Sequence, residues 1–212
     1  MNKDIKIVEK PNWVSWDEIH NVIDEAHAEN RDKGIEMRHS SLSGDEICRE
    51  IGDSGVMLVA LDGRKVVGTA AIVDKNGKKW YVSGRYAYVC FDAVLPEYSG
   101  NGIFKKLDLQ REILAKNNGY KMLVFDTHHK NIRRQQIAAK NGYIYVRFFQ
   151  SSYGHNFVVM AKWLNDCPFT NRFIVSRYKL SKKLTHFFCA SGRINNKKWN
   201  WVYIKIKRHY GL

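Results

Sequence analysis

Proline, cysteine and long apolar runs are scarce in this 212-residue chain, which has three prolines and four cysteines. Cys48, Cys90, Cys167 and Cys189 lie far apart, which argues against a disulfide framework, a paired-cysteine metal site and a Cys-x-x-Cys redox motif. No stretch approaches the roughly 18 consecutive apolar residues of a membrane-spanning helix, and the N-terminus has no apolar signal core. We therefore expect reduced thiols, no bound metal and a cytoplasmic location.

Acidic residues are scarce at the C-terminal end. Residues 165–212 hold 11 Lys and Arg against the single acid Asp166, and residues 1–164 hold 24 against 20, so the net charge of +14 divides into +10 and +4. A basic segment of this kind attracts phosphates, nucleic acid or an anionic membrane face, although it can also be an ordinary soluble surface. Apolar residues make up 44% of the chain and aromatic residues 13%, which excludes a disordered chain.

The spacing of apolar residues predicts the order of the elements. Helical spacing predicts helices at 15–34, 43–51, 103–118 and 131–140. Alternating or continuous apolar runs predict strands at 4–9, 56–60, 66–73, 80–95, 121–127, 143–151 and 156–164. Asp62-Gly63 and Asn76-Gly77 are hairpin signals, and Ser83-Gly84 indicates a bulge.

The strand at 80–95, the helix after it and the strand at 121–127 require a parallel crossover. We therefore predict a mixed α/β fold, with antiparallel strands first and a parallel pair at the centre. The length favours one core domain over 1–164 and a basic, aromatic extension over 165–212. In the extension, residues 177–188 indicate an amphipathic helix, and residues 199–207 alternate like a strand.

The segment after Pro96 has the composition of an anion site. Gly100 and Gly102 allow backbone conformations in which consecutive N–H groups converge on one point. The first turn of a helix has N–H groups without an intrahelical acceptor and a partial positive charge, so a diphosphate fits there. Glycine pairs also occur in ordinary turns. The residues of this predicted anion cradle are Ser99, Gly100, Asn101, Gly102, Ile103, Phe104 and Lys105.

Over roughly residues 4–164 the chain resembles the GNAT superfamily of N-acetyltransferases. The loop motif of that family, Arg/Gln-x-x-Gly-x-Gly/Ala after a Val-x-Pro strand end, corresponds to Ser99, Gly102 and Phe104, and the first and last of these differ from it. The Asn-led helix motif of the family agrees in register at Asn131, Ile137, Lys140, Gly142 and Tyr143. It differs at Arg134, and at Ala138, where many members have a tyrosine that protonates the departing thiolate.

The resemblance implies a fold with helices on both faces of the sheet and acetyl-CoA as cosubstrate. It implies that the pantetheine arm bonds to main-chain groups of Ala93, Val94 and Leu95, where two parallel strands splay apart, like an added strand. A backbone N–H near the splay would stabilise the oxyanion that forms during transfer. Through the matched helix motif, Asn131 joins the predicted coenzyme site.

The candidate catalytic residues lie on the two central strands. An alkyl amine titrates near lysine, at about 10.4, so a base or a water chain has to assist direct transfer. Asp92 and Asp126 are acids within apolar strands, where a carboxylate is paired or serves a site, and Tyr88 and Asp126 match positions that assist the amine in some members. His128 is a further candidate, with a helix cap as the alternative interpretation.

Cys90 raises a second route, through a covalent acetyl-thiol enzyme. By two-residue alternation Tyr86, Tyr88, Cys90 and Asp92 share one face of the strand. A cysteine nucleophile needs a neighbouring base, and the sequence places none there. Direct transfer is the better interpretation.

The sequence therefore predicts an acetyl-CoA-dependent N-acetyltransferase that acts on a primary amine by direct transfer. Amino sugars and nucleotide amino sugars are acceptors that the basic, aromatic extension would suit, so an anionic acceptor is one option. The alternatives left open are a nucleic-acid-binding protein with a GNAT-like core and attachment to an anionic membrane face through residues 177–188. Nucleic acid is the less favoured partner, and a homodimer stays open.

Overall fold

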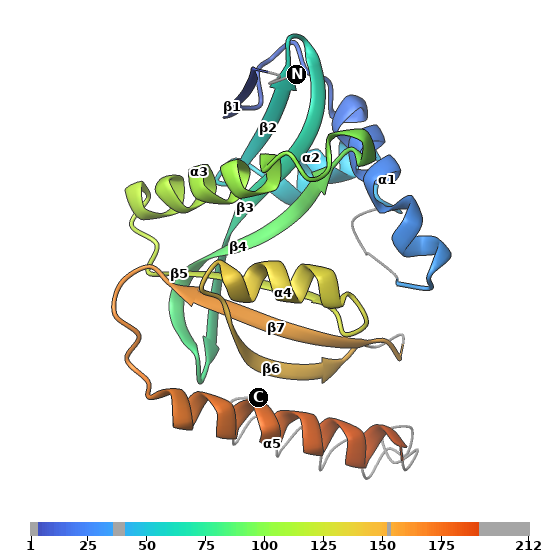
Figure 1. The fold of residues 1–212 in the computed structure, drawn as a ribbon. Helices are drawn as coiled ribbons and strands as arrows, with labels where there is room; N and C mark the ends of the chain where they lie inside the picture. Colours follow the sequence, from blue (N-terminus) through green and yellow to red (C-terminus); the bar gives the residue numbers. More distant parts are fainter. Residues whose placement is uncertain (1–3, 36–40, 152–153, 191–212) are drawn as a thin grey trace. The chain divides into compact units, whose positions relative to one another are not determined.

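A mixed seven-stranded sheet organises the chain. The computed structural model describes residues 4–35, 41–151 and 154–190. The strands are β1 Ile5–Glu9, β2 Val56–Asp62, β3 Lys65–Lys79, β4 Val82–Val94, β5 Met122–His128, β6 Ile144–Gln150 and β7 Asn156–Trp163. Their order is β1-β2-β3-β4-β5-β7-β6, with antiparallel pairs towards both edges and the parallel pair β4–β5 inside (Figure 1), as predicted. The helices are α1 Trp16–Asp32, α2 Gly44–Ile51, α3 Ile103–Asn117, α4 Ile132–Lys140 and α5 Asn171–Ala190.

The chain divides into two compact units. The first unit consists of residues 1–75 and 87–123, and the second of residues 76–86 and 124–212. The first unit holds 15 Lys and Arg against 19 acids, whereas the second holds 20 against only two, Asp126 and Asp166. The basic charge therefore belongs to the whole second unit, including the hairpin tip at 76–86, and not to the C-terminal extension alone.

Capping residues start the first two helices where the sequence predicted. Ser15 precedes α1 and its hydroxyl accepts from the Glu18 N–H at 3.0 Å. Ser43 and Glu46 form a reciprocal capping box at the start of α2. Each such cap contributes about 1 kcal/mol because it satisfies N–H groups that the helix cannot.

The core of the first unit lies between its strands and its helices. Val59, Val67 and Ala70 of the strands are fully buried, as are Ile19 of α1 and Ile47 of α2. Removing each large apolar side chain from water contributes roughly 1.5–3 kcal/mol. This packing supports β2 and β3, and β3 lies next to β4, which carries part of the predicted site.

Both hairpin predictions need correction. Asp62 pairs with Lys65, so the first turn consists of Gly63 and Arg64, one residue later than predicted. The second turn is not at Asn76-Gly77, because β3 continues to Lys79 and the chain reverses at Trp80 and Tyr81.

Tertiary packing explains the second error. A Cβ on Gly77 would lie 3.4 Å from the Tyr86 ring, an ordinary van der Waals distance, and Gly77 has no positive φ, so nothing local forces a turn there. Trp80 contacts the rings of Phe169 and Phe173 edge to face, which anchors the turn at a position without a local turn signal. Gly84 has a left-handed φ of +91° within β4, and the bulge at Ser83-Gly84 stays a prediction.

The helix predicted at 177–188 is longer and begins near residue 171. Thr170, which the sequence analysis overlooked, precedes it and accepts from the Phe173 N–H at 3.3 Å. Within the second unit α5 packs against β6 (Figure 1), and Ile174 of α5 is buried. The strand predicted at 199–207 lies outside the described residues. None of the helices described combines the length and apolar character needed to span a bilayer.

Candidate active site

The end of β4 is tied to its neighbours in the first unit. The Leu95 N–H donates to the Val67 carbonyl at 3.0 Å, and Pro96–Tyr98 then form a 3₁₀ turn. The hydroxyl of buried Tyr98 donates to the Asp62 carboxylate at 2.7 Å. The loop that follows therefore begins from a fixed point.

The predicted cradle has the backbone that an anion site needs. Gly100 and Gly102 have φ of +83° and +72°, and Gly102 is the N-cap of α3, without a side-chain cap. A Cβ at either glycine would meet no atom within 4 Å, so the left-handed conformation, and not crowding, is what calls for glycine. The ladder of α3 begins with the Lys106 N–H bonding the Gly102 carbonyl, so the N–H groups of residues 103–105 precede it.

The side chains of the cradle agree with binding through the main chain. The Asn101 amide donates to the Tyr98 carbonyl at 3.2 Å and so braces the loop, and Ser99 is exposed. The first turn of α3 contains no acid and exposes Lys105 and Lys106. A positive helix terminus beside two left-handed glycines and two lysines fits a diphosphate.

Gly68 is a residue of this region that the sequence analysis missed. A Cβ there would lie 3.0 Å from the Ala93 carbonyl oxygen and 3.3 Å from side-chain atoms of Val94 and Leu107. Glycine therefore lets β3 approach both β4 and α3 closely. A glycine inside an apolar strand is the signal that could have indicated it.

Asp92 has a structural partner. Its carboxylate forms an ion pair with Arg111 of α3, whose guanidinium also bonds the Asp108 carboxylate at 2.6 Å. The Arg111 side chain is 0% exposed, and a buried guanidinium requires such partners. The sequence predicted that Asp92 is either paired with another side chain or part of a site, and the ion pair with Arg111 shows that it is paired. The sequence did not single out Arg111 or Asp108.

The strand β4 is irregular beside Asp92. Phe91 is buried and has φ of +56°, which interrupts the extended conformation. The alternation that put Tyr86, Tyr88, Cys90 and Asp92 on one face is therefore interrupted before Asp92. For Tyr86, Tyr88 and Cys90, which precede Phe91, the shared face stays a prediction. A single left-handed residue has no local sequence signal when it is a phenylalanine.

Cys90 is buried in the core of the first unit. Burial raises the pKa of its thiol well above the ordinary value, and the negative charge of Asp92 raises it further. The thiol therefore stays protonated at neutral pH, which opposes nucleophilic catalysis.

The second unit places Asp126 half-buried on β5, near a group of titratable side chains. Burial raises the pKa of Tyr81 to about 12, an effect that Arg147 partly offsets and Asp126 adds to. The pKa of Tyr86 is also raised, first by burial and then by Asp126. Arg147 is 8% exposed and has no carboxylate partner among the described residues; its guanidinium lies 4.9 Å from the Phe149 ring centroid.

His128 is buried and organises the turn after β5. The Lys130 N–H donates to its Nδ1 at 3.3 Å, so the neutral ring carries its proton on Nε2. The helix cap is Asn131 and not His128, since Asn131 Oδ1 accepts from the Arg134 N–H at 3.1 Å. The ring of His128 instead packs against the Phe157 and His129 rings.

The predicted site residues thus fall into two groups. The first unit carries Tyr88, Asp92, the β4 end and the cradle, which are continuous along β4 and into α3. The second unit carries Asp126 and His128 on β5, with Asn131 three residues further. In the described part of the chain, no three His, Cys, Asp or Glu side chains gather as a metal site would require.

Comparisons with known proteins concern the fold and the family. Several solved structures share the fold. An aminoglycoside 6'-acetyltransferase type Ii has a TM-score of 0.60 at 17% identity, covering 77% of this chain and 99% of that one. The ribosomal-protein-S18-alanine N-acetyltransferase from Escherichia coli has a TM-score of 0.57 at 13% identity, covering 76% and 95%. A GNAT family acetyltransferase from Elizabethkingia anophelis with acetyl-CoA bound has a TM-score of 0.57 at 14% identity, covering 76% and 98%.

At these identities the likeness concerns the fold. No curated protein matches the sequence of the chain. The model of the acetyltransferase (GNAT) family, in contrast, matches residues 16–143, more than half of the chain. That match includes β4, the cradle, α3, β5 and α4. The protein therefore belongs to the GNAT family of acetyltransferases, enzymes that transfer an acetyl group from acetyl-CoA.

Proposed function

We propose that this enzyme transfers the acetyl group of acetyl-CoA directly to a primary amine, with the coenzyme diphosphate at the cradle. The observation that carries the proposal is the start of α3, where two left-handed glycines precede an uncapped, acid-free first turn. The remaining coenzyme contacts are assigned to the main chain of Ala93, Val94 and Leu95 and to Asn131. At the cradle, main-chain N–H donors suffice to bind the diphosphate because the N-terminus of α3 is itself positive.

Direct transfer is supported by the state of Cys90, whose buried, protonated thiol is a poor nucleophile. For removal of the amine proton we assign Asp126, which is a half-buried carboxylate, with Tyr88 and His128 assisting. Ala138 is fully buried and has no ionisable group, so the thiolate proton must come from water or from another side chain. A carboxylate that assists deprotonation contributes typically 100-fold to 10,000-fold in rate.

The acceptor that we favour carries phosphate as well as an amine, as nucleotide amino sugars do. The support is the charge of the second unit, with 20 Lys and Arg against two acids. Such a field raises the local concentration of an anionic substrate. Solved structures with this fold include enzymes named for aminoglycosides and for a ribosomal-protein alanine, so the fold does not choose the acceptor.

The proposal is tested by binding and by turnover. Acetyl-CoA at about 100 times its dissociation constant should raise the free energy of unfolding by about 2.7 kcal/mol. Thiol release should then be screened with amino sugars, nucleotide amino sugars, polyamines, aminoglycosides and peptides. The absence of both a stability shift and thiol release would refute the proposal.

Two substitutions separate the chemical routes on any active amine. Cys90→Ser should retain thiol release. When the amine is withheld from the wild-type enzyme, intact-mass measurement should show no acetylated protein. Asp126→Asn should lower kcat by 100-fold or more while acetyl-CoA still stabilises the protein. An acetylated Cys90 or an unchanged kcat in Asp126→Asn would contradict the assigned roles.

A further inference from the structure

The main chain of β4 departs from extended geometry at a buried position. Phe91 is 2% exposed and has φ of +56°, the only non-glycine residue with positive φ in the described ranges. A left-handed phenylalanine is unfavourable in itself and persists only when its surroundings over-determine it. Such outliers gather at functional sites, and this one lies two residues before Ala93.

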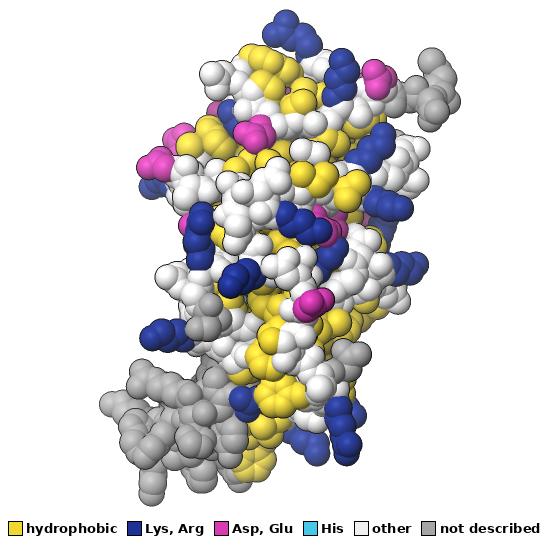
Figure 2. All heavy atoms as spheres, turned by 90° about the vertical axis from the view of Figure 1, so that its left-hand side faces the viewer, with side chains coloured by type: hydrophobic (Ala, Val, Ile, Leu, Met, Phe, Trp, Pro, Cys, Tyr) yellow, Lys and Arg dark blue, Asp and Glu magenta, His cyan; other side chains and the backbone are white. Residues whose placement is uncertain are grey.

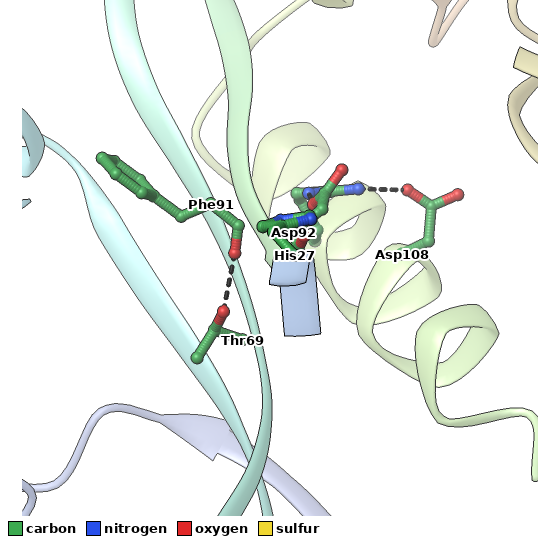
Figure 3. Close-up of polar contacts among 6 residues, drawn as sticks. His27, Thr69, Phe91, Asp92 and Asp108 are labelled. Atoms are coloured by element: carbon green, nitrogen blue, oxygen red, sulfur yellow. Dashed lines mark hydrogen bonds and ion pairs between the residues drawn. The ribbon is translucent and has the colours of Figure 1, made fainter. Parts of the chain in front are cut away.

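Two side chains hold the carbonyl of Phe91 and the carbonyl of the residue after it (Figure 3). Thr69 of β3, which is 0% exposed, donates its hydroxyl to the Phe91 carbonyl at 2.7 Å. His27 of α1 donates from Nε2 to the Asp92 carbonyl at 3.0 Å. Asn30 donates to Nδ1 of the same ring at 3.2 Å, which places the ring proton on Nε2.

A third contact ties Asp92 to the helix of the cradle. Nη1 of Arg111 on α3 pairs with the Asp92 carboxylate, and Nη2 of the same guanidinium bonds the Asp108 carboxylate at 2.6 Å. Arg111 lies about two turns from the N-terminus of α3, so it couples that helix to β4. The strand and the helix terminus thus share one anchor.

These contacts bracket the segment assigned to the coenzyme. On its N-terminal side the Asp92 carbonyl is held by His27, and on its C-terminal side the Leu95 N–H is held by Val67. Ala93 and Val94 lie between the two fixed points. The segment is therefore fixed by hydrogen bonds at both of its ends.

We infer that Thr69, His27 and Arg111, here called the β4 clamp, are positioning residues for acetyl-CoA. The clamp sets the main chain of β4 at Phe91 and Asp92 so that residues 93–95 and the N-terminus of α3 face one coenzyme. In this role Asp92 acts through Arg111 and is not the general base. The inference rests on the proposed function.

The clamp is tested by paired substitutions at two of its members. Thr69→Val removes the hydroxyl at constant shape, and Thr69→Ser restores it. His27→Leu removes the donor, and His27→Gln offers an amide donor in its place. We expect Thr69→Val and His27→Leu to raise KM for acetyl-CoA about tenfold, and Thr69→Ser and His27→Gln to recover most of the loss.

His20→Leu is the matched control. His20 lies on the same helix α1, and its Nδ1 contacts a main-chain carbonyl, that of Leu42, at 2.7 Å. Its loss should lower the melting temperature without changing KM for acetyl-CoA. If His20→Leu and His27→Leu raise KM equally, the effect is general destabilisation and the clamp is refuted.

Asp92→Asn separates positioning from base catalysis. As a positioning residue it should raise KM for acetyl-CoA and leave the shape of the pH profile of kcat unchanged. If Asp92 were the base, the acidic limb of that profile would disappear and the inference would be overturned.

Amide hydrogen exchange gives a readout that needs no coenzyme. Peptides covering residues 91–105 should exchange at least tenfold faster in His27→Leu than in His20→Leu, because the clamp fixes that segment. Equal exchange would refute the clamp whatever the activity. If the wild-type protein fails to bind acetyl-CoA, both the proposed function and the role of the clamp in coenzyme binding are refuted. Amide hydrogen exchange would then still show whether the clamp fixes the main chain of β4.

Discussion

Three left-handed residues shape the segment that runs from Phe91 to the start of α3. Gly100 and Gly102 adopt this conformation in the cradle, where glycine is the residue type that does so without strain. Phe91 adopts it inside β4, where hydrogen bonds to its own and the following carbonyl compensate. The cradle was therefore predictable from its residue types, whereas the departure at Phe91 was not.

Gly102 offers a test at the level of one backbone angle. Gly102→Val should destabilise the protein by about 1–2 kcal/mol or more, since a β-branched residue resists φ of +72°. Gly102→Asn should be milder, because asparagine tolerates that region. Calorimetric titration with acetyl-CoA should show weaker binding for the valine variant than for the asparagine variant, and equal affinities would contradict a backbone role.

The raised pKa of Tyr81 predicts that the folded protein loses stability at alkaline pH. Its folded pKa of about 12 exceeds the ordinary 10.0, so at high pH the unfolded chain loses the hydroxyl proton first. The stability present below pH 10 should decline as pH rises from 10 to 12, by up to about 2–3 kcal/mol for this group. Urea unfolding of wild type and Tyr81→Phe between pH 8 and 11.5 checks this. A decline as steep in Tyr81→Phe as in wild type would show that other groups are responsible.

At the scale of elements, α5 covers the edge strand β6 in the second unit. The Ser181 hydroxyl accepts from the Phe148 N–H at 2.9 Å, and the Thr185 hydroxyl donates to the Phe148 carbonyl at 3.3 Å. An open strand edge is a template for pairing with another chain, and these hydroxyls occupy one residue of it. The boundary predicted at 164/165 stays a prediction, and cutting there would remove both hydroxyls.

Ser181→Ala should therefore destabilise the protein by about 1–3 kcal/mol, because it leaves a buried N–H without an acceptor. Ser176→Ala, an exposed position on the same helix, is the control and should be neutral or slightly stabilising. Chemical denaturation measures both. If the two variants behave alike, the hydroxyl contact contributes nothing to stability.

At the scale of the whole molecule, the charge is divided unequally between the two units. The first unit has a formal charge of −4 and the second +18, which together give +14. Figure 2 shows one face on which Lys and Arg side chains stand singly among neutral and apolar surface. The positive field of the second unit attracts anions.

The salt concentration at which the protein elutes from heparin should depend on the positive charge of the second unit more than on that of the first. Reversing three exposed lysines of α5 to glutamate changes the net charge as much as reversing three exposed lysines of the first unit. The α5 set is Lys179, Lys182 and Lys183, and the control set is Lys6, Lys75 and Lys121. The α5 variant should elute at clearly lower salt, because polyanion binding depends on local cations. Equal elution would mean that only net charge matters.

Much of the fold was predictable because it depends on neighbouring residues. Ser15, Ser43 and Asn131 cap the helices that their positions indicate, and Gly119 follows the end of α3 with positive φ. Where distant packing competes, local signals failed. Asn76-Gly77 lies inside β3, and the turn forms where Trp80 packs against α5.

By itself, the sequence determined the order of helices and strands, the family resemblance and the cradle, because caps, apolar periods and left-handed glycines are properties of short segments. Only the tertiary structure decided that Asp92 pairs with buried Arg111, that Phe91 is left-handed, and that the positive charge belongs to the whole second unit. These features depend on side chains that are far apart in the chain: Thr69, His27 and Arg111 come from three different elements, and no local pattern encodes their meeting on β4.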